Sequence, residues 1–240
     1  MDLLPIFLNI KKQKCVVVGG GEVAFRKASL LLRAGANLTI IAVSVEEQLR
    51  QLCSQHNATV IEKAFEKSDL EGSTLVVAAT DDTQVNERVS VAATDDSQVN
   101  ERVSVAATSL SIPVNVVDQP HLCSFIMPSI VDRSPIVIAI SSGGSSPVLT
   151  RKLKELNETM IPGRIDKLAE LLGSYRGRVK AGIEDFSGRL RFWESVLDSE
   201  IPELVYSGQD DKAREALDAR LAEPVCGRVT GEVYLVGAGP

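Results

Sequence analysis

The sequence predicts an α/β protein: a Rossmann-like, doubly wound parallel sheet, followed by a small α+β region and a helical domain. Two observations predict the sheet. Short apolar strands alternate with helical segments through the first half of the chain, and a glycine-rich turn joins a strand to a helix near the N-terminus. A third observation predicts the helical domain. From Pro147 onward, apolar residues recur almost wholly at helical spacing.

The strands expected in the first sheet are short and apolar, which is typical of parallel strands covered on both faces. They are Ile6–Ile10, Cys15–Val18, Leu38–Val43, Thr59–Glu62, Leu75–Ala79 and Val114–Val117. A helix is expected over Ala24–Arg33, ending at Gly35. The next helix is expected to start at a capping box formed by Ser44 and Glu47.

The pattern changes after residue 123. Phe125–Val131 and Ile136–Ile140 are expected to form two antiparallel strands outside the first sheet, joined by a turn at 132–135. The helices expected after them are Arg151–Met160, Ile165–Leu172, Gly188–Leu197 and Asp211–Leu221. The last ten residues, 231–240, read as one more strand and a glycine turn, which predicts the start of a further domain.

Residues 77–90 and 91–104 are near-identical copies that differ only at Thr83 and Ser97, and a third VAAT follows at 105–108. A tandem duplication explains this repeat, because solenoid repeats are longer and more divergent. The copies are compatible with one long helix over about 83–109, or with two helices separated by a break. We expect helix in both copies, with a kink or loop near Asp95, leaving the sheet intact.

Composition indicates an ordinary soluble protein, with 44% hydrophobic and 24% charged residues. The net charge of -6 argues against nucleic acid as a partner. No apolar run is long enough for a membrane span, and the N-terminus lacks the basic region of a secretory signal. The cysteines, scattered without a CxxC pair, predict reduced thiols in a cytoplasmic protein and neither a zinc site nor disulfides. They are Cys15, Cys53, Cys123 and Cys226.

The glycine turn is the strongest local signal. Gly19, Gly21 and Ala24 match the spacing of a dinucleotide-binding turn, in which backbone N–H groups at a helix start receive the pyrophosphate. The alternative is any tight strand–helix turn. The second strand ends in Ala42-Val43-Ser44, without the acidic residue that binds ribose and without an arginine, so the preference for NAD or NADP cannot be read there.

Two further sites carry polar groups. Asp118 follows a buried strand, at the sheet edge where ligands bind, and is a candidate general base or a group that handles a metal in transit. A turn aspartate is the equally weighted alternative. The loop at 141–149 offers serine hydroxyls and backbone N–H groups before a helix that begins near Pro147. A flexible connector is the alternative there.

The ordered segments LPIF, VVGGGEVAFRKA, VAATDD, NERVS, NVVD, SFIMPSIVDRSP, SSGGSSPVL and RFWE resemble the N-terminal half of bacterial siroheme synthases. The resemblance covers the whole chain apart from the insert. It implies NAD-dependent oxidation of precorrin-2 to sirohydrochlorin, and then insertion of ferrous iron, a substrate, to give siroheme. It also implies a missing C-terminal domain that methylates uroporphyrinogen III with S-adenosylmethionine.

The resemblance further implies the roles of single residues. Gly19, Gly21, Glu22, Val23, Val43 and Ser44 would bind NAD. Asp118 would be the catalytic base and a transient iron ligand, Ser142 an active-site serine that can be phosphorylated, and Pro240 the one retained contact to S-adenosylmethionine.

The expected domains are 1–123 for NAD binding, 124–160 for homodimerisation, 161–225 as a helical domain and 231–240 as the start of the methyltransferase. Two other functions stay open: a dehydrogenase without chelatase activity, and a non-catalytic module that binds a nucleotide or tetrapyrrole.

Overall fold

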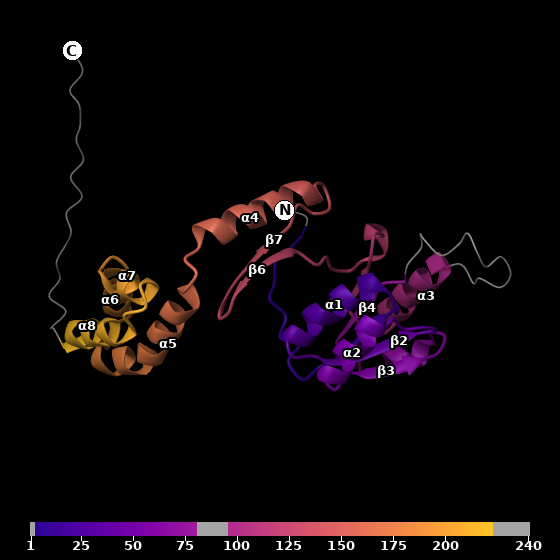
Figure 1. Ribbon diagram of the computed structural model, residues 1–240, viewed down its shortest axis with the longest axis horizontal. Coiled ribbons are helices and arrows are strands. Elements are labelled where there is room, and N and C mark those ends of the chain that lie inside the picture. Colours follow the sequence, from indigo (N-terminus) through magenta and orange to yellow (C-terminus); the bar gives the residue numbers. More distant parts are fainter. Residues whose placement is uncertain (1–2, 81–95, 223–240) are drawn as a thin grey trace, which may run out of the picture. The chain divides into compact units, whose positions relative to one another are not determined.

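The computed structural model describes residues 3–80 and 96–222. The chain divides into two compact units, which are described separately below. The first contains the chain up to Pro128 together with the segment Ser141–Pro147. The second contains the two-stranded ribbon Ser129–Ile140 and the helices that follow Pro147. Figure 1 shows the elements of both.

The first unit is built on a five-stranded parallel sheet in the order β3-β2-β1-β4-β5, which confirms the predicted fold class. From β1 the chain builds outward through β2 and β3, then returns to the other side of β1 for β4 and β5, so the strand order reverses between β1 and β4. The strands are β1 Lys14–Val18, β2 Asn37–Ala42, β3 Thr59–Glu62, β4 Leu75–Ala78 and β5 Val114–Val116.

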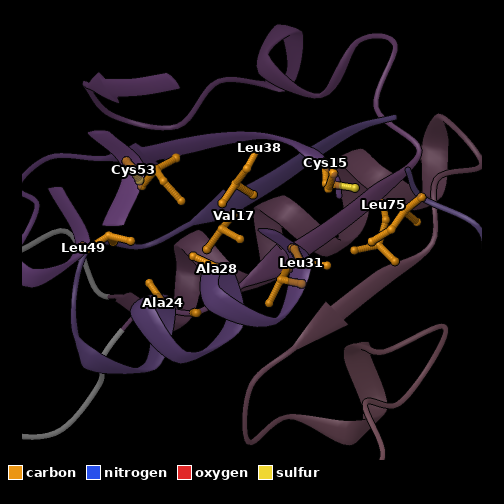
Figure 2. Packing of buried hydrophobic residues seen from close by; sticks show 14 of the residues in the cluster. Cys15, Val17, Ala24, Ala28, Leu31, Leu38, Leu49, Cys53 and Leu75 are labelled. Atoms are coloured by element: carbon orange, nitrogen blue, oxygen red, sulfur yellow. The ribbon is translucent and has the colours of Figure 1, made fainter. Parts of the chain in front are cut away.

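Helices cover both faces of this sheet. α1 (Glu22–Arg33) and α2 (Glu47–Gln55) pack on one face, where their small and apolar residues meet alternate residues of β1, β2 and β4. Figure 2 shows this packing, with Ala24, Ala28 and Leu31 of α1 beside Val17 of β1. α3 (Asp96–Ser109) and the short helix η1 (Lys67–Leu70) pack on the other face. Burial on both faces explains why the strands are continuously apolar.

The duplicated sequence contributes to the fold from both copies. β4 begins two residues before the first copy and ends inside it, and Ala79 and Thr80 also belong to the first copy. α3 is made by the second copy and the VAAT that follows it. The hydroxyl of Thr80 donates to Oδ1 of Asn100 across 2.8 Å, which joins the two copies. The described part of the second copy is helical, as expected. The positions around Asp95, where a kink or loop was predicted, lie outside the described residues.

The second unit begins with an antiparallel ribbon of β6 (Ser129–Arg133) and β7 (Ile136–Ile140), in register from Ser129–Ile140 to Arg133–Ile136. The helices that follow Pro147 confirm the predicted helical character. α5, α6, α7 and α8 share one core, in which Leu168, Tyr175, Phe192 and Leu217 are buried. The helices are α4 Pro147–Met160, α5 Ile165–Gly182, α6 Phe186–Leu197, α7 Ile201–Tyr206 and α8 Asp210–Ala222.

Three local expectations were wrong. Residues 6–10 form no strand, and Ile6 and Phe7 are exposed. Ser44 does not cap α2, which starts at Glu47 with no side-chain cap. The first ribbon strand starts only at Ser129, because Phe125 and Met127 pack instead against the core of the first unit.

One helix, α7, was not predicted from the sequence. It has six residues and begins with Ile-Pro, so helical periodicity had little length in which to show. The expected strand within 231–240 lies outside the described residues.

Candidate active site

The glycine turn follows β1 at the carboxyl edge of the sheet and is held tightly by its neighbours. Gly19 has a φ of +136°, and a Cβ there would lie 2.1 Å from the carbonyl oxygen of Ala79. A Cβ on Gly20 would lie 1.9 Å from the carbonyl oxygen of Ser44. The N–H of Gly19 donates to the carbonyl of Ile41 across 2.9 Å. Only glycine fits at the first two positions, and the second of them, Gly20, was not singled out from the motif.

Gly21 is the N-cap residue of α1, and its carbonyl accepts the first intrahelical bond, from the N–H of Phe25 (3.0 Å). The N–H groups of Glu22, Val23 and Ala24 therefore have no partner within the helix. Together with the helix dipole, they make this end a place for an anion such as a pyrophosphate. Ala24 is fully buried, so α1 packs closely on the sheet as the motif requires.

The end of β2 lies beside this turn and completes a surface for a dinucleotide. Val43 is 79% exposed and Ser44 is exposed, although both follow a buried strand. Their loop is tied to the turn by the N–H of Glu46, which donates to the carbonyl of Gly20 across 2.9 Å. A nucleoside needs an apolar surface and a hydroxyl partner, and its phosphates need N–H donors. The residues at this edge therefore fit NAD.

Asp118 stands exposed at the carboxyl end of β5, in the left-handed region with a φ of +58°. This conformation is costly for a residue other than glycine, so the surrounding turn must hold it. The N–H of Gln119 donates to the carbonyl of Val116 (3.4 Å). The sulfur of Cys123 accepts from the N–H of Val116 (3.1 Å) and donates back to its carbonyl (3.2 Å). The turn therefore presents the carboxylate at the edge that also carries the glycine turn.

Lys27 brings a positive charge to this carboxylate. It lies half-buried on α1, and burial lowers the pKa of its ammonium, as does the charge of Arg26. The charges of Asp118 and Cys123 raise this pKa and so act in the opposite direction. Sequence reasoning missed Lys27. Its position three residues after the buried Ala24 was the available signal, because residues at that spacing share a helix face.

Ser142 is half-buried in the loop that follows β7. Its hydroxyl oxygen accepts from the N–H of Ser146 (2.9 Å), and its carbonyl accepts from the N–H of Ser145 (3.1 Å). The next two residues, Gly143 and Gly144, have φ values of +64° and +89°. The loop is thus a defined turn before α4, and the predicted start of that helix at Pro147 is confirmed. Pro240 lies outside the described residues.

Within residues 3–80 and 96–222, no group of three or more His, Cys, Asp or Glu side chains is arranged to hold a metal ion. In the same ranges, no helix is long and apolar enough to cross a membrane.

Two family models match the chain. One, described as "Putative NAD(P)-binding", matches residues 6–93 and 89–129, and these segments meet inside the duplicated sequence. The other, described as "Sirohaem synthase dimerisation region", matches residues 164–221. The second match covers helices of the second unit and lies beyond the segment 124–160 that was expected to form a dimer.

Curated relatives match all of this chain. The siroheme synthase of Nitrosospira multiformis is 50% identical over 244 aligned residues, which cover 100% of this chain and 49% of the relative. Those of Nitrosococcus oceani and Pseudomonas aeruginosa are 44% and 45% identical, again over 100% of this chain and 48% and 49% of their own lengths. The chain therefore spans about half the length of the curated relatives it matches.

A solved structure named SirC, precorrin-2 dehydrogenase, superposes with a TM-score of 0.64, covering 90% of this chain and 100% of that one. At 19% identity this likeness shows the fold alone. The sequence matches go further: the chain resembles siroheme synthases along its entire length, and it belongs to the NAD(P)-binding family whose model covers residues 6–129.

Proposed function

We propose that this chain oxidises precorrin-2 to sirohydrochlorin with NAD and then assists insertion of ferrous iron, giving siroheme. One observation carries the proposal. The glycine turn at α1 and the exposed carboxylate of Asp118 lie at the same edge of one parallel sheet, on either side of the strand-order reversal. That edge is where open α/β sheets bind their ligands. The siroheme synthases that resemble the whole chain supply the substrate class.

The oxidation removes a hydride and a proton from precorrin-2. The nicotinamide, when bound, accepts the hydride. Asp118 receives the proton, for which an exposed carboxylate at the edge is suited. The products are sirohydrochlorin and the reduced nicotinamide, with the proton passing from Asp118 to water.

Iron insertion also requires a group that accepts protons. Ferrous iron enters as a substrate, and two pyrrole nitrogens must lose their protons as it binds. A carboxylate beside the tetrapyrrole assists by taking these protons in turn, and Asp118 also offers an oxygen ligand to iron in transit. We assign the hydroxyl and backbone groups of the Ser142 loop to contacts with the substrate.

We also propose that the chain works as a homodimer. The ribbon and α4 expose an apolar set that a monomer would leave in water: Ile136, Val137, Val148, Leu149, Leu153, Leu156 and Met160. A lone two-stranded ribbon is marginal in water, and a second copy related by two-fold symmetry would cover it. The match to a dimerisation region in the same unit supports this assembly. A monomeric mass by light scattering at micromolar concentration would contradict it.

The whole protein, if it is built like its relatives, would further methylate uroporphyrinogen III with S-adenosylmethionine. Pro240 would then belong to that second activity.

The test supplies the purified chain with precorrin-2 and NAD, and then with ferrous iron, while absorbance is followed through both steps. Reduced nicotinamide formed in step with sirohydrochlorin supports the dehydrogenase. Siroheme formed faster than in a protein-free control supports the chelatase. Oxidation without accelerated iron insertion would reduce the proposal to a dehydrogenase. Ligand binding without either reaction would indicate a sensing module.

A further inference from the structure

Lys27 follows Val23 by four residues in α1, so the two side chains share one face of the helix. α1 packs through Val23, Ala24 and Ala28 into the cluster that also takes Val117, the residue before Asp118. Because α1 returns over a parallel sheet, its N-terminal end lies at the carboxyl edge of the strands. Side chains of a helix tilt toward its N-terminus, so a lysine one turn inside the helix reaches back toward that edge.

The ammonium of Lys27 is half-buried and makes no hydrogen bond or ion pair with any described residue. Two other lysines of this unit have partners. Lys14 donates to the carbonyls of Asp69 and Glu71, and Lys63 pairs with Asp69 across 2.7 Å. Holding an ammonium partly out of water without a close partner costs free energy, which an arriving anion would recover.

We infer that Lys27 binds a carboxylate of the tetrapyrrole substrate and so fixes the ring beside Asp118. The inference rests on the proposed function for the identity of the substrate. Precorrin-2 and sirohydrochlorin carry many carboxylates and no phosphate, and a lysine supplies a compact charge with three donors for such a group.

Two features separate Lys27 from the cofactor surface. The pyrophosphate donors are backbone N–H groups in the first turn of α1, whereas Lys27 offers a side-chain ammonium from a position five residues after Glu22. The nucleoside surface at Val43 follows β2, whereas Asp118 follows β5. With β1 and β4 between them, the two strand ends are about 14 Å apart. Lys27 interacts with the Asp118 end.

The experiment compares Lys27→Met with Arg26→Met in the full chain. Both variants lose one positive charge from the same helix, but Arg26 is exposed. The probes are sirohydrochlorin, whose binding is followed by absorbance, and NAD, followed by protein fluorescence. Lys27→Met should weaken sirohydrochlorin binding about tenfold, equivalent to one charge-assisted contact at a half-exposed site, and leave NAD affinity within twofold. Arg26→Met should change both affinities less than twofold.

Steady-state kinetics add an independent readout. The KM for precorrin-2 should rise in Lys27→Met and be restored in large part by Lys27→Arg, with kcat changing less than KM. Added salt should weaken sirohydrochlorin binding more in the wild type than in Lys27→Met. If the methionine variant fails to give a normal melting curve, Lys27→Gln carries the same comparison.

Three results would overturn the inference: equal sirohydrochlorin affinity in Lys27→Met and Arg26→Met, a loss confined to NAD affinity, or no sirohydrochlorin binding by the wild type. Failure of the proposed function looks different. A chain that binds sirohydrochlorin through Lys27 but never reduces NAD would keep the inference and remove the catalytic assignment.

Discussion

Gly20→Ala tests how the glycine turn is built, because it adds one methyl group at a contact between two loops. A Cβ on Gly20 would lie 1.9 Å from the carbonyl oxygen of Ser44 and 3.1 Å from the Cβ of Ala42. Such contacts are essentially never closer than 3.0 Å in proteins. The obstacle is backbone, so the loop after β2 must move away from the turn.

The cost has two parts. Overpacking of this kind typically destabilises a protein by about 1–3 kcal/mol. The displaced loop also strains the 2.9 Å hydrogen bond from the N–H of Glu46 to the carbonyl of Gly20, whose loss would cost about 1 kcal/mol. The expected total is about 2–4 kcal/mol, which for a unit of this size lowers Tm by about 6–15 °C. Because the moved loop carries Val43 and Ser44, NAD should bind at least about tenfold more weakly.

The measurement is a thermal melt with and without NAD, beside an NAD titration at a temperature where both proteins are folded. Gly72→Ala is the control for an added methyl group that meets no neighbour. Gly72 has a positive φ of +69°, a conformation that Gly20 does not share, and a Cβ there meets nothing within 4 Å, so only backbone strain of about 1 kcal/mol is expected. If Gly20→Ala melts like Gly72→Ala and binds NAD like the wild type, the proposed role of this contact is wrong.

Three further predictions concern other parts of the chain. Burial raises the pKa of the Cys15 thiol to about 11. At pH 8 a disulfide reagent should therefore modify Cys15 only at the rate at which the protein unfolds. Fast modification of Cys15 in the native protein would contradict this burial. The hydrogen bond from Arg178 lowers the pKa of Asp218, so its stabilisation is present above the unfolded pKa and lost as pH falls through the folded one. Asp218→Asn should therefore melt below the wild type at pH 7 and approach it between about pH 5 and 2; a constant difference would show that the carboxylate charge is not involved. Deleting residues 91–104 should raise Tm, because the first copy then supplies the same helix sequence; a large loss of stability would mean that the insert is part of the core.

The sheet could be predicted from the sequence because its central strands are short, continuous apolar runs. A continuous apolar run such as Cys15–Val18 predicts a strand that is buried on both faces, and all four of its residues are buried in the structure. The ends of elements were harder to predict. Phe125 was expected in the ribbon strand, but it packs against the core of the first unit. The local sequence does not distinguish an aromatic residue in a strand from one that anchors a loop to a core.

The site could be predicted in part. Gly19 and Asp118 each follow a short apolar run, and such runs can be recognised in the sequence. Gly20 and Lys27 depend on contacts between segments distant in the chain, with Ser44 and with Asp118 respectively. Local spacing carries no information on which loop will press against a turn, or on which carboxylate a helix lysine will face.

In the mechanism proposed above, Asp118 accepts the proton released when precorrin-2 is oxidised. Asp118→Asn keeps the size of the side chain and removes its basicity, so Tm and NAD affinity should stay at wild-type values. The rate of NAD reduction by precorrin-2 should fall at least about 100-fold, the lower end of what a general base contributes. A variant that reduces NAD at the wild-type rate would contradict this role and leave Asp118 as a turn residue.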